Sequence, residues 1–143
     1  MEAKIVGSFR INTAGNRTTE EVVAAGNYDW TNDRVNGENF PMRPMPEGPR
    51  KIVYLEFEVN PYLEEKVLVE AQRQGLERPL YEDVLFFGEQ YPEEQRKGPI
   101  AFLHEPWHGW RVGLGRDKAG RGLGLNYFGG IYRRRCRFAF ILP

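Results

Sequence analysis

Hydrophobic and polar residues alternate along two segments of the chain, as they do in β-strands that bury one face. In residues 3–11 the alternation is regular, and it ends at a turn that begins at Asn12. Residues 51–59 give the clearest pattern, because one face is made of Val53, Leu55, Phe57 and Val59. We therefore predict a β-strand in each segment.

Three segments carry the signals of helix ends. Thr18 and Glu21 are spaced as a capping box, in which each side chain bonds the backbone of the other residue at the start of a helix. Glycine is common just past the last turn of a helix, and proline is tolerated only in the first turn. On these grounds the helices are predicted to begin at Thr18, at Asn60-Pro61 and near Pro79, and to end at Gly26, at Gly75 and before Pro92.

The last third of the chain is predicted to be rich in strands. Apolar or alternating runs cover residues 100–103, 110–115, 121–127 and 132–141, and turn residues join the second and third of them into a hairpin. The full order of elements is β-α-β-α-α-β-β-β-β. This order predicts a single α+β domain over residues 1–143, with a mainly antiparallel sheet and two to three helices packed on one of its faces.

A long proline-rich loop is predicted at residues 27–49, where no hydrophobic period holds. Loops of this length inside a compact domain are usually functional or disordered. This loop contains Trp30, Phe40, Met42 and Met45, which are too apolar for a free linker. It is therefore expected to pack across a surface, as a lid, as an arm that reaches a second subunit or as an irregular cover.

The composition fits a globular chain without a bulk charge. Lysine and arginine number 20 and balance 20 acidic residues, which argues against a protein that coats nucleic acid or membrane by its overall charge. The balance is uneven along the chain, however, because residues 51–98 carry a net charge of −5 and residues 99–143 carry +6. These opposite charges either meet inside the fold or leave a basic end for an anionic partner.

No targeting segment is evident in the sequence, so a cytoplasmic location is expected. The first residues lack an apolar core of signal-peptide length, and no apolar stretch approaches the ~18 residues that span a membrane. The single cysteine, Cys136, cannot form an intrachain disulfide and is expected to be a buried structural thiol.

One motif suggests a metal site. The five residues from His104 to His108 resemble the H-E-x-x-H motif of zinc metallopeptidases, which needs a helix to place both imidazoles on one face. Pro106 and Gly109 oppose a helix here, and no third ligand is marked. We interpret the motif as a chance match and expect no metal, no cofactor and no catalytic residue.

Glycine alternates with Val or Leu in residues 112–115 and 122–125. On two regular strands this pattern leaves one face bare, which permits close approach by a helix, a flat ligand or another backbone. Bulges or close internal packing are the structural alternative.

A basic strand face is the clearest candidate for binding. Alternation places Arg133, Arg135 and Arg137 on one side of the last strand, and guanidinium groups suit phosphate oxygens. Aromatic residues that could stack on bases are nearby in sequence, and the candidate binding residues are therefore Arg133, Arg135, Arg137, Trp107, Trp110 and Tyr127. A cross-strand ladder with Glu56 and Glu58, or an oligomer interface, would account for the arginines instead.

These features favour a non-enzymatic binding or protein-interaction module that acts as a homodimer. Aromatic and arginine enrichment is typical of interface cores, and the proline-rich loop adds apolar surface. A small ligand is a possible partner. The alternatives are binding of single-stranded nucleic acid through the Arg/aromatic sheet face, and a small metal-dependent or acid-base enzyme centred on His104, Glu105 and His108.

Overall fold

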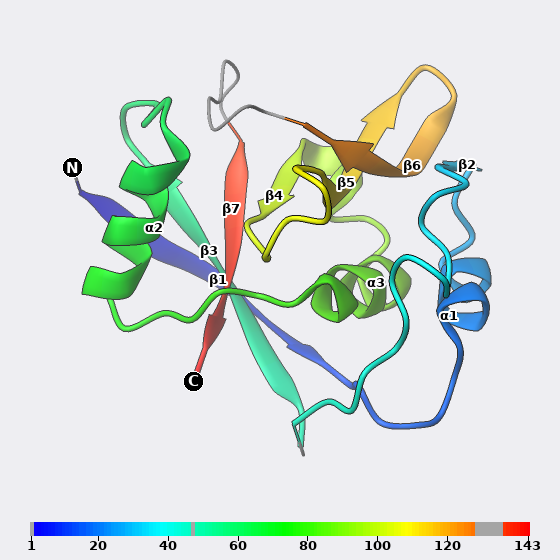
Figure 1. Cartoon of the computed structure of the whole chain (residues 1–143). Coiled ribbons are helices and arrows are strands. Elements are labelled where there is room, and N and C mark those ends of the chain that lie inside the picture. The colour runs from blue at the N-terminus through cyan, green and yellow to red at the C-terminus, as the bar shows by residue number, and fades with distance from the viewer. Residues whose placement is uncertain (1, 47, 128–135) are drawn as a thin grey trace.

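The chain folds around a seven-stranded mixed sheet, shown in the computed structural model of Figure 1, which describes residues 2–46, 48–127 and 136–143. The strands are β1 (Ala3–Ile11), β2 (Trp30–Thr31), β3 (Arg50–Phe57), β4 (Ile100–Phe102), β5 (Arg111–Asp117), β6 (Gly120–Asn126) and β7 (Arg137–Leu142). The helices are α1 (Thr19–Ala25), α2 (Glu64–Arg73), α3 (Tyr81–Gln90) and the 3-10 helix η1 (Gln95–Lys97). The predicted α+β class is confirmed.

The sheet differs from the prediction in its strand pairing. Its order is β1-β3-β7-β4-β5-β6-β2, and the pairs β4–β7 and β2–β6 are parallel, whereas the other pairs are antiparallel. The sheet is therefore mixed and larger than predicted. β2 comes from the loop at residues 27–49, where its two residues give no periodic signal, and β7 returns past the β5–β6 hairpin to lie beside β4.

Helices cover both faces of the sheet, so the prediction of helices on one face is wrong. Ile52 and Tyr54 of β3 pack in a core with α3, while Val53 and Leu55 pack in a second core with Val67 of α2. In Figure 1, α2 lies on one side of β3 and β7, and α3 and α1 lie on the other. Because β3 is apolar on both faces, each face needs a covering helix.

The helix ends agree only in part with their sequence signals. The Thr18 hydroxyl accepts a hydrogen bond from the Glu21 amide at 3.1 Å, and Glu21 accepts one from the Thr18 amide at 2.9 Å, so the capping box is confirmed. Helix α2 begins at Glu64 rather than at Asn60-Pro61, because Tyr62 has a positive φ of 61° that interrupts the helix.

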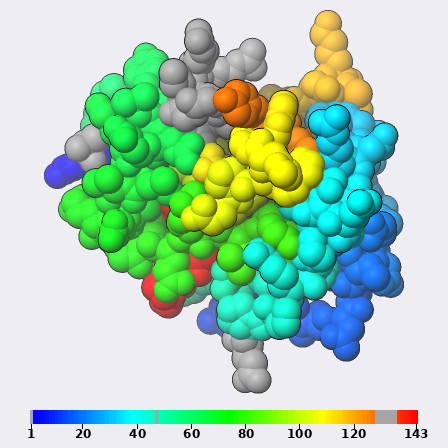
Figure 2. Space-filling model, viewed as in Figure 1, coloured from blue at the N-terminus to red at the C-terminus, as the bar shows by residue number. Residues whose placement is uncertain are grey.

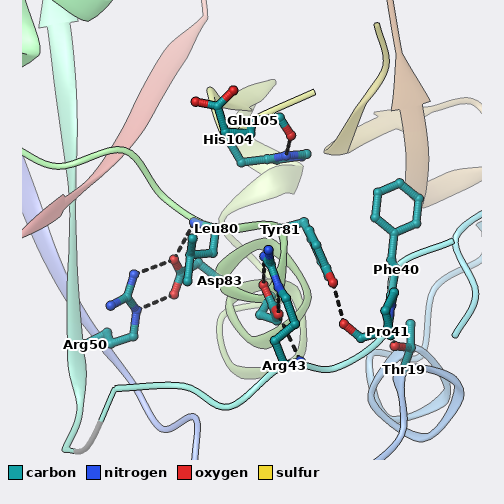
Figure 3. A network of polar contacts seen from close by, with 11 residues as sticks. Thr19, Phe40, Pro41, Arg43, Arg50, Leu80, Tyr81, Asp83, His104 and Glu105 are labelled. Atoms are coloured by element: carbon teal, nitrogen blue, oxygen red, sulfur yellow. Dashed lines mark hydrogen bonds and ion pairs between the residues drawn. The ribbon is translucent and has the colours of Figure 1, made fainter. Parts of the chain in front are cut away.

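Part of the 27–49 loop belongs to the core. Val35 and Phe40 are buried, and the Thr19 hydroxyl donates a hydrogen bond to the Phe40 carbonyl at 2.5 Å. The following residues 41–46 and 48–50, which we call the strap, are held against the first turn of α3. Arg43 and Arg50 each form a two-bond ion pair with a fully buried carboxylate, from Glu82 and Asp83 respectively (Figure 3).

Side chains bond the backbone at both ends of the edge strand β1. The backbone of Ala3 donates to Glu70 of α2 and accepts from Gln74, which caps the C-terminal end of α2. At the other end, the Asn12 backbone exchanges two bonds with the Gln90 side chain. These amide and carboxylate groups occupy backbone positions that a neighbouring strand would otherwise pair with.

Arg121 of β6 joins three separate elements. Its guanidinium donates to the Gly26 carbonyl after α1 at 2.7 Å, to the Gly88 carbonyl of α3 at 2.8 Å and to the Gln95 side chain at 3.0 Å. Arg121 is 2% exposed, and its guanidinium lies 4.7 Å from the centre of the Tyr28 ring. Its positive charge is thus held by neutral acceptors and by the carbonyl end of a helix.

We expect the substitution Arg121→Met to lower the free energy of unfolding by about 3–5 kcal/mol, because buried carbonyls on two helices lose their donor. Urea denaturation measures the change. The control is Arg116→Met, which removes the exposed residue that faces Arg121 across the β5–β6 pair and should cost at most about 0.5 kcal/mol. Equal losses in the two variants would contradict the structural role of Arg121.

Two buried tyrosines should respond oppositely to loss of the hydroxyl. The Tyr28 hydroxyl is buried without a hydrogen-bond partner in the described residues, whereas the Tyr54 hydroxyl donates to Glu94 at 2.8 Å. Tyr28→Phe should leave the free energy of unfolding unchanged or raise it by about 1 kcal/mol, and Tyr54→Phe should lower it by about 1–2 kcal/mol. Thermal or urea unfolding of both variants checks the sign, and a loss only in Tyr28→Phe would refute it.

Candidate functional site

The two histidines do not form the zinc motif that their spacing suggests. Residues 104–108 do not form a helix: His108 has a φ of 49°, and Trp107 pairs with Trp110 across a tight turn. His104 is 1% exposed, its Nδ1 bonds the Glu105 carbonyl at 2.8 Å, and its Nε2 accepts from the Val112 amide at 2.9 Å. Both ring nitrogens are therefore occupied. Within the described part of the chain, no three His, Cys, Asp or Glu side chains are grouped to hold a metal ion.

Burial shifts the pKa values of His104 and Cys136 so that the neutral form of each side chain is favoured. Desolvation lowers the pKa of His104 to about 4 and raises the pKa of the Cys136 thiol to about 12. Cys136 packs beside the α2 core. At neutral pH the imidazole is uncharged and the thiol protonated, so neither is prepared for acid-base or nucleophilic chemistry.

Of the three candidate arginines, only Arg137 lies in the described residues; Arg133 and Arg135 lie outside them. The Arg137 guanidinium bonds the Glu94 carboxylate at 3.2 Å and the carbonyls of Glu94 and Gly98 at 2.7 and 2.9 Å. It also lies 4.8 Å from the centre of the Tyr54 ring. Its acidic partner is Glu94, 43 residues away, rather than Glu56 or Glu58 of the predicted ladder.

The three candidate aromatic residues divide into a packed residue and an exposed pair. Trp107 is half-buried, with its ring centre 5.4 Å from that of Phe40. Trp110 and Tyr127 are 36% and 63% exposed, and their ring centres are 5.5 Å apart. The structure therefore brings together two of the predicted binding residues at the surface.

The bare glycine face of β6 is occupied by the protein itself. Gly113 pairs with Gly124 and Gly115 with Gly122, as the alternation implied. The indole of Trp30 lies against the strand, because a Cβ at Gly122 would be 2.0 Å from its ring atoms. Close internal packing thus explains this stripe, and the flat group that it accommodates is a side chain from β2.

Five exposed apolar side chains lie on the segment before α2 and on the segments around Trp110 and Tyr127. They are Val59, Tyr62, Leu63, Trp110 and Tyr127, each at least 36% exposed. Two elements meet there because Arg111, next to Trp110, bonds Glu64, next to Leu63, at 2.9 and 2.5 Å. Figure 2 shows the segment around Trp110, in yellow, projecting on the front of the molecule. We call these five residues the apolar surface.

Sequence reasoning recognised two of these five residues as binding candidates. It placed Val59 on the buried face of a strand and predicted a helix from Asn60-Pro61 that would include Leu63, whereas both residues are exposed and Leu63 precedes the helix. The missed signal is that Val59, Tyr62 and Leu63 lie close together at a position where neither strand nor helix periodicity continues. Nothing in the sequence indicated that this run lies beside Trp110.

Comparison with known protein families, curated proteins and solved structures gave no match for this chain, and no family is assigned. Across the residues that the structure describes, no helix is both long and apolar enough to cross a membrane.

The buried His104 should make stability depend on pH. Its pKa falls from 6.5 in the unfolded chain to about 4 in the fold, so unfolding takes up a proton between these values. Neutral His104 therefore contributes about 3 kcal/mol to the free energy of unfolding. This contribution is fully present above pH 6.5 and is lost as the pH falls to 4. His104→Asn should flatten this part of the stability curve.

The control for this prediction is His108→Asn. His108 is exposed, and its left-handed backbone conformation suits asparagine. Urea titrations between pH 4 and 7 measure how the free energy of unfolding changes with pH. The slope should equal that of the wild type in His108→Asn and should be shallower in His104→Asn. Parallel curves for all three proteins would show that His104 does not titrate as described.

Proposed function

We propose that the chain is a non-enzymatic binding protein that acts as a homodimer through the apolar surface. The observation that supports this proposal is that five exposed apolar side chains lie on two distant segments that one ion pair joins. The side chains of Arg111 and Glu64 are only 10% and 18% exposed, so the charges that join the two segments are already paired. Paired charges flanked by aromatic side chains match the composition of interface cores.

The state of the buried ionisable groups favours binding over catalysis. Glu82, Asp83 and Glu94 each bond an arginine, and Arg73 with other donors lowers the pKa of Glu70 to about 2. The lowered pKa values of Glu70 and Glu94 make these two carboxylates poor proton acceptors at neutral pH, and the oxygens of Glu82 and Asp83 are occupied by arginine donors. With His104 neutral and bonded at both nitrogens, the described residues offer no evident acid-base pair.

Association through the apolar surface is also favoured by the state of the sheet edges. The backbone at both ends of β1 is capped by side chains, so pairing of two β1 edges would break existing hydrogen bonds. A dimer built on side-chain packing around Trp110 and Tyr62 requires no such loss. Two copies of one patch would meet across a two-fold axis, as in most homodimers.

The double substitution Trp110→Ser with Tyr127→Ser should convert the dimer to a monomer, because it removes the two neighbouring aromatic rings from the apolar surface. Light scattering with size-exclusion chromatography at micromolar protein concentration measures the mass. Val69→Ser is the matched control, since Val69 is 66% exposed on α2 but lines a separate surface with Lys66 and Arg73. A wild-type protein of monomeric mass would overturn the dimer.

Single-stranded nucleic acid is the alternative partner for Trp110 and Tyr127. Tyr127 of the exposed ring pair lies six residues before Arg133 in the sequence, and stacking with basic side chains is typical of single-strand binding. A fluorescent oligonucleotide mixed with the protein in about 50 mM salt distinguishes the two partners. Salt-sensitive binding by a monomeric protein would favour nucleic acid, and a dimer without binding would favour association.

A further inference from the structure

A cleft separates the link between β1 and α1 from the strap. Its volume is about 620 Å³, within the range of small-molecule sites. One wall is the segment from Thr13 to Arg17, and the other is formed by strap residues 42–46 and Gly48. In Figure 1 these two segments run near each other at the lower right of the molecule. The apolar surface contributes no residue to the cleft.

Part of the cleft lining is apolar. Phe86 of α3 is 5% exposed and forms part of its lining, and Met42 and Met45 on the strap are half-buried against the same core. Methionine side chains adapt their shape and make favourable contacts between sulfur and aromatic rings. The Arg17 guanidinium lies 5.7 Å from the centre of the Phe86 ring. A flat hydrophobic group would therefore find complementary surface on both sides.

Two guanidinium groups at the cleft keep unused donors. Arg17 binds Glu89 through both terminal nitrogens at 2.5 and 2.8 Å, and its Nε–H has no partner among the residues that the structure describes. Arg43 binds Glu82 through Nε and Nη2, and its Nη1 has no partner in the described residues. The two neighbouring carboxylates are thus already satisfied, and a bound molecule must bring its own acceptor.

Thr13 supplies the clearest unmet donor. The residue is 7% exposed and lines the cleft, and no described residue hydrogen-bonds its hydroxyl. Its hydroxyl oxygen is not among the fully inaccessible, unbonded polar atoms, so it is reached from the cleft rather than sealed in the core. A buried hydroxyl without a protein partner is uncommon, and a bound ligand or water would satisfy it.

We propose that this cleft binds small carboxylic acids with an aromatic body. The carboxylate accepts hydrogen bonds from the Thr13 hydroxyl and the unused Arg43 nitrogen, and the ring lies between Phe86 and the two methionines. A carboxylate suits this site because charge-assisted bonds to guanidinium are strong and because the acidic partners Glu82 and Glu89 are already paired. The site is independent of the proposed dimer.

The test uses 3-phenylpropionate as the probe, with calorimetry or ligand-observed NMR as the measurement. Thr13→Val keeps the shape of the side chain and removes only the hydroxyl. Because that hydroxyl has no protein partner, the variant should melt no lower than the wild type, yet bind the probe about tenfold more weakly. The neutral analogue 3-phenylpropionamide should also bind more weakly than the acid.

A variant that fills the cleft tests whether the probe binds there or elsewhere on the protein. Ala14→Trp places a large side chain at an exposed position of the cleft and should abolish binding, whereas Ala119→Trp, in the exposed β5–β6 turn, should leave it unchanged. No binding of the probe at about 1 mM, a weak affinity by ordinary standards, would overturn the proposal. So would equal binding by the wild type and Ala14→Trp.

The double variant that should be monomeric tests whether the dimer and the cleft are independent. Trp110→Ser with Tyr127→Ser should bind 3-phenylpropionate as the wild type does, because neither residue lines the cleft. Loss of probe binding in that variant would overturn the independence of the cleft. A monomeric wild type that still binds the probe would overturn the dimer alone.

Discussion

The position of α3 depends on one buried guanidinium. Arg121 bonds carbonyls of Gly26 and Gly88, and so ties the ends of two helices to β6. Because α3 is fixed in this way, Glu82 and Asp83 in its first turn can hold the strap through Arg43 and Arg50. Two further residues of α3 shape the cleft. The Phe86 ring lines it, and the Glu89 carboxylate accepts the hydrogen bonds of Arg17. The strap and both walls of the cleft are thus arranged around α3.

The uneven distribution of charge along the chain has a structural explanation at two positions. Arg111 and Arg137, from the basic last third, bond Glu64 and Glu94, from the acidic middle. Partly buried ion pairs of this kind add little net stability, because removing both charges from water costs about as much as their attraction returns. Their value lies in specificity, since a wrong packing would leave a buried charge alone. Arg121 follows another principle, with peptide dipoles in place of a carboxylate.

Local signals predicted the local structure well. The alternation in residues 3–11 and the capping box at Thr18 were sufficient for β1 and the start of α1, because both patterns depend on neighbouring residues. The partner of Arg137 and the parallel pairing of β2 with β6 depend on residues far apart in sequence, which no periodicity reports. For the candidate site, the sequence indicated Trp110 and Tyr127 but gave no sign that Tyr62 lies on the same surface. The donors around Thr13 became evident only when the bonds of each carboxylate were known.

Backbone strain gives the apolar surface a further significance. Among the described residues, the non-glycine positions with positive φ are Asn27, Tyr62 and His108. Asparagine adopts this conformation readily, whereas for a bulky side chain it costs about 1–2 kcal/mol. Tyr62 and His108 are the two residues that turn the chain immediately before Leu63 and two residues before Trp110. Strain of this size persists only where the surrounding structure enforces it, and it is often found at functional positions. Here the two strained turns lie next to the exposed side chains of Leu63 and Trp110, on the segments that the Arg111–Glu64 ion pair joins, which is where the proposed association would take place.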